Sequence, residues 1–214
     1  MDGQKSVGEQ EIMNDAAAGN ILGLYQRHAA AFARQRSRRL IEKPWLDKFI
    51  AAMGGNGRLL DIGCGNGQPI AEYFIRRHLS VTGIDGAVAM LDRARSRFPQ
   101  QRWLHLDMRA MALDETFEGL IAWDSFFHLP REDQKLMFPI FNRHSHKGSA
   151  LMFTSGPGNG IAMGEFAGEP LYHASLAPDE YGALLAEQGF AVIDSVVEDP
   201  LCGGHTIWLC KRVE

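Results

Sequence analysis

The sequence contains few cysteines and no long apolar run. Its three cysteines, Cys64, Cys202 and Cys210, are odd in number and form no C-x-x-C pair, so they fit a reducing compartment and provide no zinc framework. No apolar stretch approaches the roughly 20 residues that cross a bilayer, and no basic segment followed by an apolar one opens the chain. We therefore expect a cytoplasmic protein that contacts no membrane and binds no metal.

Positive charge is not in excess either, because the formal net charge at pH 7 is -4. A dedicated nucleic-acid binder normally carries a net basic domain, so this balance argues against a nucleic-acid partner. The exception is a segment with a single acid, Glu42, and the basic residues Arg27, Arg34, Arg36, Arg38, Arg39 and Lys43. A solvated helix face explains this segment better than a site for a polyanion or a carboxylate does.

The remaining composition is that of an ordinary globular domain, with 45% hydrophobic and 22% charged residues in 214 positions. We expect a loose tail over residues 1–15 and a single domain over residues 16–214. Between residues 16 and 55, apolar residues at helical spacing predict two amphipathic helices. The first contains Ile21, Leu24 and Tyr25, and the second begins at Pro44.

Strand and helix patterns then alternate along the chain. Short apolar runs predict strands at residues 58–62, 80–85, 103–106, 119–123 and 149–153. Such alternation is typical of a doubly wound α/β fold with a mostly parallel sheet. Two more predicted strands, 190–197 and 206–210, are joined by a short connection and should be antiparallel neighbours. Residues 154–174 are rich in glycine and proline, show no period and are expected to form a long loop beside the substrate.

A glycine-rich turn, Asp61-Ile62-Gly63-Cys64-Gly65-Asn66-Gly67, follows the first of these strands. Doubly wound sheets bind nucleotides at this place. A dinucleotide fingerprint, G-x-G-x-x-G, would require glycine at position 68, where the chain has Gln68. The spacing therefore disfavours NAD or FAD, and with them an NAD-dependent reductase.

The segment Leu60–Gly67 resembles the first motif of class I S-adenosylmethionine-dependent methyltransferases, and the resemblance extends from about Leu59 to the C-terminus. It implies a seven-stranded sheet in the order 3-2-1-4-5-7-6, with the last strand antiparallel and the helices of residues 16–55 covering the site. It also implies S-adenosylmethionine as cofactor and S-adenosylhomocysteine as product. The segments around His173 and His205 resemble a bacterial subgroup that acts on small molecules.

The same resemblance implies where the cofactor binds. Asp85 matches the acid that holds the ribose, although an acid there could instead cap the next helix. Asp107 and Met108 match the adenine contacts, while Tyr25 matches a segment that closes over the cofactor and could equally be core. The cofactor-binding residues implied in this way are Tyr25, Asp61, Gly63, Cys64, Gly65, Asp85, Gly86, Met90, Asp107, Met108, Ala122, Trp123 and Asp124.

Methyl transfer from a sulfonium needs alignment and the exclusion of water, and it needs a base only if the acceptor must lose a proton. Histidine suits that role near neutral pH. The candidates are His128, His173 and His205, each with a purely structural role as its alternative. The acceptor, the oligomeric state and the base remain open. The alternatives to a small-molecule enzyme are a nucleic-acid methyltransferase and a non-catalytic cofactor-binding module.

Overall fold

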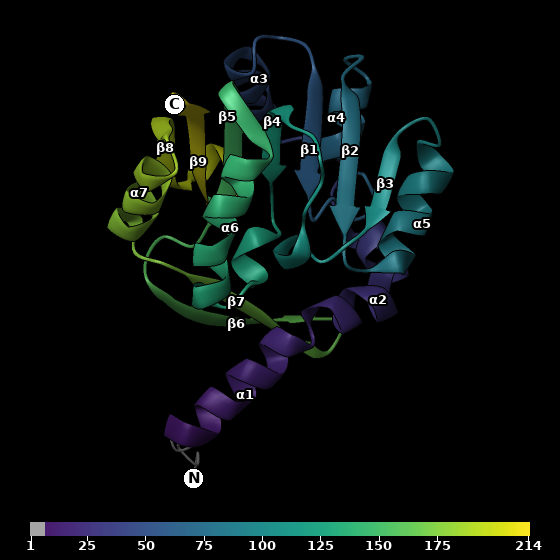
Figure 1. Cartoon of the computed structure of the whole chain (residues 1–214). Coiled ribbons are helices and arrows are strands. Elements are labelled where there is room, and N and C mark those ends of the chain that lie inside the picture. The colour runs from purple at the N-terminus through teal and green to yellow at the C-terminus, as the bar shows by residue number, and fades with distance from the viewer. Residues whose placement is uncertain (1–6) are drawn as a thin grey trace.

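The computed structural model describes residues 7–214, in which a central sheet lies between two sets of helices (Figure 1). The sheet has seven strands in the order β3-β2-β1-β4-β5-β9-β8. Their bounds are β1 (Arg58–Ile62), β2 (Ser80–Asp85), β3 (Arg102–His105), β4 (Phe117–Ala122), β5 (Ser145–Ser155), β8 (Phe190–Asp199) and β9 (His205–Arg212). Along β3-β2-β1-β4-β5 each strand is parallel to the next, while β9 runs antiparallel to both β5 and β8. The predicted strand order and the reversed last strand are confirmed.

Helices bury both faces of this sheet. On one face lie α3 (Lys43–Ala52), α4 (Ile70–Ile75) and α5 (Val88–Arg97), and on the other lie α6 (Arg131–Arg143) and α7 (Pro178–Glu187). The first core contains Phe49 and Phe74, and the second contains Phe138 and Tyr181. Because central strands are covered on both sides, β1 and β4 are buried along almost their whole length instead of at alternate residues.

The N-terminal segment differs from its prediction. Helix α1 (Val7–Gly19) occupies residues 7–15 of the expected loose tail, so that prediction is wrong there, and residues 1–6 lie outside the described residues. The segment is rich in helix formers but lacks a periodic apolar face, and Ile12 is 71% exposed. Its last turn is anchored by Ala17, which packs beside Tyr172. The next helix, α2 (Ile21–Gln35), lies against α5.

The predicted loop at residues 154–174 is also wrong, because most of it is a hairpin. Strands β6 (Gly160–Phe166) and β7 (Glu169–Ser175) pair antiparallel, outside the main sheet. Their turn is Ala167-Gly168, and both residues have positive φ, at 54° and 83°. That backbone matches the two-residue turns of tight hairpins. Glycines and a proline interrupt the strand pattern of this segment in the sequence. Most side chains of β6 are also exposed on both faces, so they do not alternate between apolar and polar.

Short 3-10 turns complete the chain: η1 (Met108–Ala110), η2 (Phe126–His128) and η3 (Pro200–Cys202). The first two follow β3 and β4, at the same edge of the sheet as the glycine-rich turn. Among residues 7–214, no helix has the length and apolar character needed to span a membrane.

Candidate active site

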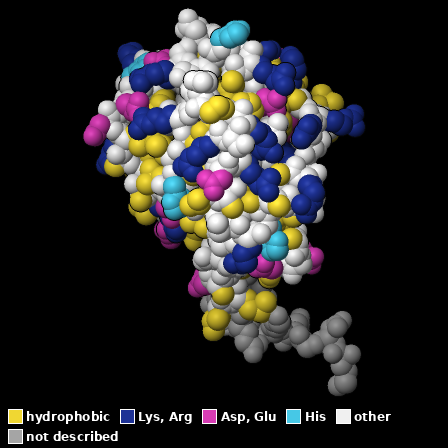
Figure 2. Space-filling view, turned by 90° about the vertical axis from the view of Figure 1, so that its right-hand side faces the viewer, with side chains coloured by type: hydrophobic (Ala, Val, Ile, Leu, Met, Phe, Trp, Pro, Cys, Tyr) yellow, Lys and Arg dark blue, Asp and Glu magenta, His cyan; other side chains and the backbone are white. Residues whose placement is uncertain are grey.

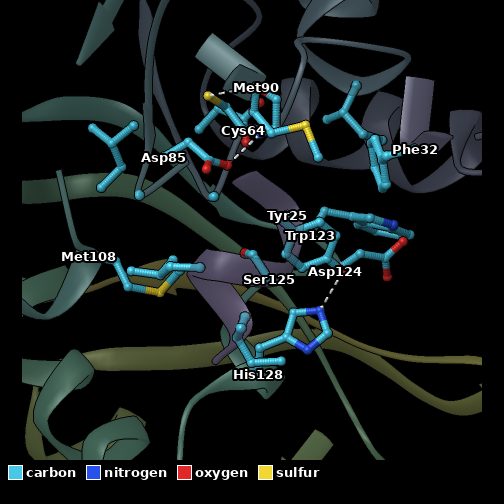
Figure 3. Close-up of a pocket in the computed structure, with 18 of the residues that line it drawn as sticks. Tyr25, Phe32, Cys64, Asp85, Met90, Met108, Trp123, Asp124, Ser125 and His128 are labelled. Atoms are coloured by element: carbon cyan, nitrogen blue, oxygen red, sulfur yellow. Dashed lines mark hydrogen bonds between the residues drawn. The ribbon is translucent and has the colours of Figure 1, made fainter. Parts of the chain in front are cut away.

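A cavity of about 400 Å³ opens at the carboxyl ends of the parallel strands and is covered by α2 (Figure 3). All but one of the predicted cofactor-binding residues line it. These are Tyr25, Asp61, Gly63, Cys64, Gly65, Asp85, Gly86, Met90, Asp107, Met108, Trp123 and Asp124. The exception is Ala122, which is fully buried in the core on the side of α6. Its prediction is wrong because the last residue of β4 points away from the cavity.

The glycine-rich turn is fastened to two neighbouring strands. The backbone N–H groups of Gly63 and Cys64 both donate to the Ile84 carbonyl at 2.9 Å. Gly63 has a φ of +76°, and a Cβ added there would lie 2.3 Å from the Ser125 Cβ. The Ser125 hydroxyl in turn donates to the Ile62 carbonyl at 2.6 Å. Glycine is therefore required at position 63 by both conformation and space.

Two carboxyl groups lie behind this turn. Asp85 accepts the Gly65 N–H at 2.8 Å and the Ala87 N–H at 2.8 Å, the latter one residue before α5 begins. Burial raises the pKa of Asp85 and outweighs the two hydrogen bonds that lower it. Burial, with Asp85 nearby, also raises the pKa of Asp61 to about 7. Asp85 therefore braces the glycine-rich turn and also holds the backbone at Ala87, the N-cap residue of α5.

Asp107 sits at the far end of the cavity, after β3. Its carboxylate accepts from the Arg109 guanidinium at 2.6 Å, and Arg109 also reaches Asp133 at 2.9 Å. The hydrogen bonds from Arg109 hold the pKa of Asp107 below its usual value. Asp107 is therefore ionised at neutral pH and positioned by an arginine that the sequence pattern did not indicate.

A charged network closes the opposite end. Arg36 donates to Glu42 at 2.8 Å and lies 3.6 Å from Asp124, while Asp124 accepts from His205 at 2.8 Å. Within residues 7–214, the indole Nε1 of Trp123 and one oxygen of Glu42 are buried without a hydrogen-bond partner. Because buried donors are normally satisfied, the Trp123 N–H fits a donor reserved for a ligand.

His205 belongs to this network and does not line the cavity. Its Nε2 faces the Asp124 carboxylate, and its Nδ1 lies 2.6 Å from the Cys202 carbonyl. Two acceptors require a proton on each nitrogen. The Asp124 hydrogen bond and charge raise the pKa of His205 in spite of its burial. The geometry contradicts a role for His205 as a base, since a protonated imidazole cannot take another proton.

His128 lines the cavity, but both of its ring nitrogens are occupied. Nδ1 donates to the Tyr172 carbonyl at 2.8 Å, so Nε2 accepts the Tyr25 hydroxyl at 3.0 Å. Burial lowers the pKa of His128 to about 4. The ring therefore stays neutral at pH 7 and fixes Tyr25 over the cavity. Burial and the nearby acids Asp124 and Asp85 raise the pKa of Tyr25, so its hydroxyl keeps its proton.

His173 is the third candidate, and it comes from the hairpin. It lines the cavity and lies against Phe127 and His128, with ring centroids 5.1 and 4.9 Å apart. Burial lowers its pKa, whereas backbone carbonyl groups of Ala162 and Leu171 raise it slightly. The imidazole is therefore neutral at pH 7. Of the three predicted histidines, His173 is the one that lines the cavity and is recognised by backbone groups, those of Ala162 and Leu171, whereas His128 and His205 are hydrogen-bonded to the side chains of Tyr25 and Asp124.

Several residues line the cavity in addition to those predicted for the site. They are Ile21, Leu22, Phe32, Arg36, Gln68, Ile70, Ile84, Leu106, Ser125 and Phe127. Phe32 and Arg36 continue the helical spacing of Tyr25 and could have been found from it. No sequence pattern indicated Phe127, because its position depends on the 3-10 turn η2. Among residues 7–214, no group of His, Cys, Asp and Glu is arranged to hold a metal ion.

Three of the six basic residues in the segment at residues 27–43 pair with separate acids. Arg27 pairs with Glu169 at 2.5 Å, Arg36 with Glu42, and Lys43 with Asp47. On the side of the molecule where α2 and α5 lie, basic side chains are interspersed with acidic and apolar ones (Figure 2). This distribution supports the interpretation of a solvated helix face.

Comparisons with known proteins agree with this geometry. Residues 59–148 match the family model described as a methyltransferase domain. The chain is 27% identical over 209 residues to a malonyl-[acyl-carrier protein] O-methyltransferase from Paenibacillus sp. (strain JDR-2), covering 86% of this chain and 71% of the relative. It is 32% identical over 94 residues to a trans-aconitate 2-methyltransferase from Azoarcus sp. (strain BH72), covering 44% of this chain but only 36% of that relative.

Solved structures show the same fold. An S-adenosylmethionine-dependent methyltransferase from Clostridium acetobutylicum ATCC 824 superposes with a TM-score of 0.69 at 14% identity, covering 89% of this chain and 99% of that one. An amino pentose methyltransferase from Micromonospora echinaspora, solved with S-adenosylmethionine bound, superposes with a TM-score of 0.68 at 20% identity, covering 100% and 99%. The chain therefore contains a methyltransferase domain over residues 59–148 and has the fold and strand order of class I S-adenosylmethionine-dependent methyltransferases, enzymes whose cofactor is S-adenosylmethionine.

Proposed function

We propose that this enzyme transfers the methyl group to a small-molecule acceptor by in-line displacement, within a single domain over residues 16–214. The observation that carries the proposal is the wall of Phe127, His128 and His173, which α2 encloses together with the cofactor end of the cavity. An enclosed wall of this kind suits a small molecule that is shielded from water. It suits a base in a nucleic-acid strand less well, and on the face seen in Figure 2 basic side chains lie among acidic and apolar ones.

The residues of the cavity fit the cofactor. A Cβ at Gly65 would project toward Phe32, 3.8 Å away across the cavity, so glycine leaves that space free for a ligand. In this proposal Asp85 accepts hydrogen bonds from the ribose, and Asp107 with Met108 holds the adenine. Arg36 and the free N–H of Trp123 face the amino-acid end. When bound, the cofactor supplies an activated methyl group on a sulfonium.

This chain's own residues would then align the reactants and move one proton. Tyr25, fixed by His128, covers the cavity and presents an aromatic ring to a cationic ligand. His173, neutral and facing the acceptor end, takes the acceptor's proton at a ring nitrogen. His128 keeps its proton on Nδ1 and acts as a positioning residue. Residues 154–174 border the acceptor as a hairpin rather than as a loop.

Calorimetry with S-adenosylhomocysteine and with NADH tests the cofactor assignment, because tight binding is expected for the first alone. A panel of thiols, phenols, amines and carboxylic acids, assayed for release of S-adenosylhomocysteine, then tests the acceptor. Turnover of a small molecule supports the proposal. Turnover of a DNA or RNA duplex, with silence across the panel, would refute it.

A further inference from the structure

A second recess adjoins the cofactor cavity behind Phe127 and His173, which line both spaces. It has a volume of about 280 Å³ and lies between the end of β5 and the hairpin β6–β7. Its other lining residues are Ser155, Gly156, Pro157, Gly158, Gly160, Ile161, Ala162, Ala174 and Ser175. Phe127 and His173 therefore lie between the two spaces, and a molecule that passes these rings would occupy both.

The recess is apolar in its chemistry. None of the residues lining it, all of them within the described chain, carries an acidic, lysine or arginine side chain. Its two hydroxyl groups are already engaged, since Ser155 donates to the Gly156 carbonyl and accepts from Trp208, while Ser175 accepts the Gly156 N–H at 2.6 Å. Small residues keep it open, and a Cβ at Gly158 or Gly160 would meet no atom within 4 Å.

The junction of the two spaces is neutral as well. Phe127, His128 and His173 meet there, and burial lowers the pKa of both histidines. The cavity's arginine, Arg36, is bonded to Glu42 and lies beside Asp124 at the opposite end. A carboxylate at this junction would lose its water without meeting a cation among the described residues that line the recess, since Arg131, the cation beside the turn, is bonded to the Asn159 side chain at 2.8 Å.

Building on the function proposed above, we infer that the acceptor is an uncharged hydroxyl compound, of the phenol or alcohol type, whose apolar body fills this recess while its hydroxyl meets His173. In the reaction, the hydroxyl proton passes to a ring nitrogen of His173 and the oxygen forms a bond to the methyl carbon. The carbon–sulfur bond breaks with its electron pair on sulfur. The products are a methyl ether, S-adenosylhomocysteine and a proton that His173 later releases to water.

Calorimetry on the protein saturated with S-adenosylhomocysteine tests this inference with three probes: phenol, 4-propylphenol and 4-propylbenzoate. We expect 4-propylphenol to bind about ten- to fiftyfold more tightly than phenol, because its three extra carbons are buried. We expect 4-propylbenzoate to bind roughly tenfold more weakly than 4-propylphenol, because its charge is unpaired. Mass spectrometry should detect the methyl ether of 4-propylphenol when S-adenosylmethionine replaces the product.

Two substitutions that fill the recess from different walls locate the probe, Ala162→Phe from β6 and Gly158→Leu from the turn after β5. Each should remove most of the advantage of 4-propylphenol over phenol and leave S-adenosylhomocysteine binding unchanged. Met163→Phe is the matched control, because Met163 is the next residue of β6, is 40% exposed and lines neither space. It should change neither affinity.

The outcomes separate this inference from the proposed function. Equal or tighter binding of 4-propylbenzoate, or an unchanged ratio of phenol affinities in both filled variants, would overturn the acceptor class while the cofactor site stands. Failure of the wild-type protein to bind S-adenosylhomocysteine would overturn the proposed function itself, and the acceptor class with it.

Discussion

The two halves of the active site are built in different ways. The cofactor half lies at the ends of three consecutive strands that pair with one another. Gly63 follows β1, Asp85 is the last residue of β2, and Asp107 comes shortly after β3. The acceptor half is assembled from segments far apart in the chain, as in the Tyr25–His128 hydrogen bond, which joins residues 103 positions apart. The first half therefore has a sequence pattern, and the second has none.

The two halves of the active site also differ in the charge of the side chains that line them. The cofactor half carries Asp61, Asp85 and Asp107, together with the Arg36 network at its end. The acceptor half presents neutral aromatic and imidazole rings. A charged, hydrogen-bonding ligand fits the first half and an uncharged one fits the second. The four predictions below test this division.

The largest effect is expected from His173→Ala in the acceptor half. Turnover of 4-propylphenol should fall by about 10²–10⁴-fold, the usual contribution of a general base, with S-adenosylhomocysteine affinity unchanged. His146→Ala is the control, because His146 lies on β5 with an exposed side chain near Glu118 and lines neither space. An unchanged rate in the His173 variant, measured by release of S-adenosylhomocysteine, would remove His173 as the base.

Glycine substitutions compare the backbones of the two halves. Gly63→Ala should lower the free energy of unfolding by about 2–4 kcal/mol, because the residue has positive φ and its new Cβ would clash with Ser125. Gly158→Ala should stay within about 0.5 kcal/mol, because a Cβ there meets open space. Urea unfolding measures both. Similar losses of unfolding free energy at Gly63 and Gly158 would contradict this difference between the two halves.

Asp85→Ala tests the polar contacts of the cofactor half. It should weaken S-adenosylhomocysteine binding by about 1.5–3 kcal/mol, because charge-assisted hydrogen bonds to the ribose are lost and the brace on Gly65 is removed. Asp92→Ala, on the exposed side of α5, is the control. Calorimetry that finds equal affinities for the two variants would leave Asp85 with a structural role only.

The smallest effect concerns the hairpin of the acceptor half. Hydrogen bonds from Arg27 and His28 lower the pKa of Glu169 to about 2 from its ordinary 4.5. A carboxyl whose pKa is lowered by folding stabilises the fold above its unfolded pKa, and the contribution is lost as pH falls from about 4.5 toward 2. Glu169→Gln should therefore speed hydrogen exchange across residues 160–175 at neutral pH and weaken its acid dependence. Glu165→Gln, on the same hairpin, should do neither.

Several elements could be predicted because their signals are local. The turn from Asp61 to Gly67 appears as spaced glycines after an apolar run, and the strand order follows from the family resemblance to that turn and the acids behind it. The last two strands were predicted to pair because a short connection leaves them no other neighbour. Ala122 shows the limit of such predictions, because a position at the end of a strand does not tell on which face of the sheet the side chain lies.

The hairpin and the three histidines could not be assigned in this way. Strand β6 buries little and β7 is buried only in its second half, so no clear alternation marks them, and Glu169 of this hairpin pairs with Arg27 and His28 of α2. His128, His173 and His205 are chemically identical in sequence. Burial and partners separate them into a positioning group, a candidate base and a charged ion-pair member.

The sequence by itself indicated the cofactor through a family resemblance, since the glycine-rich turn and strand-end acids that carry it are short-range features that any sheet of this kind places at one edge. Only the tertiary structure decided the neutral wall of Phe127, His128 and His173 and the recess behind it. Those features depend on the packing of α2, η2 and the hairpin against one another, and burial sets the charge of a histidine only once that packing exists.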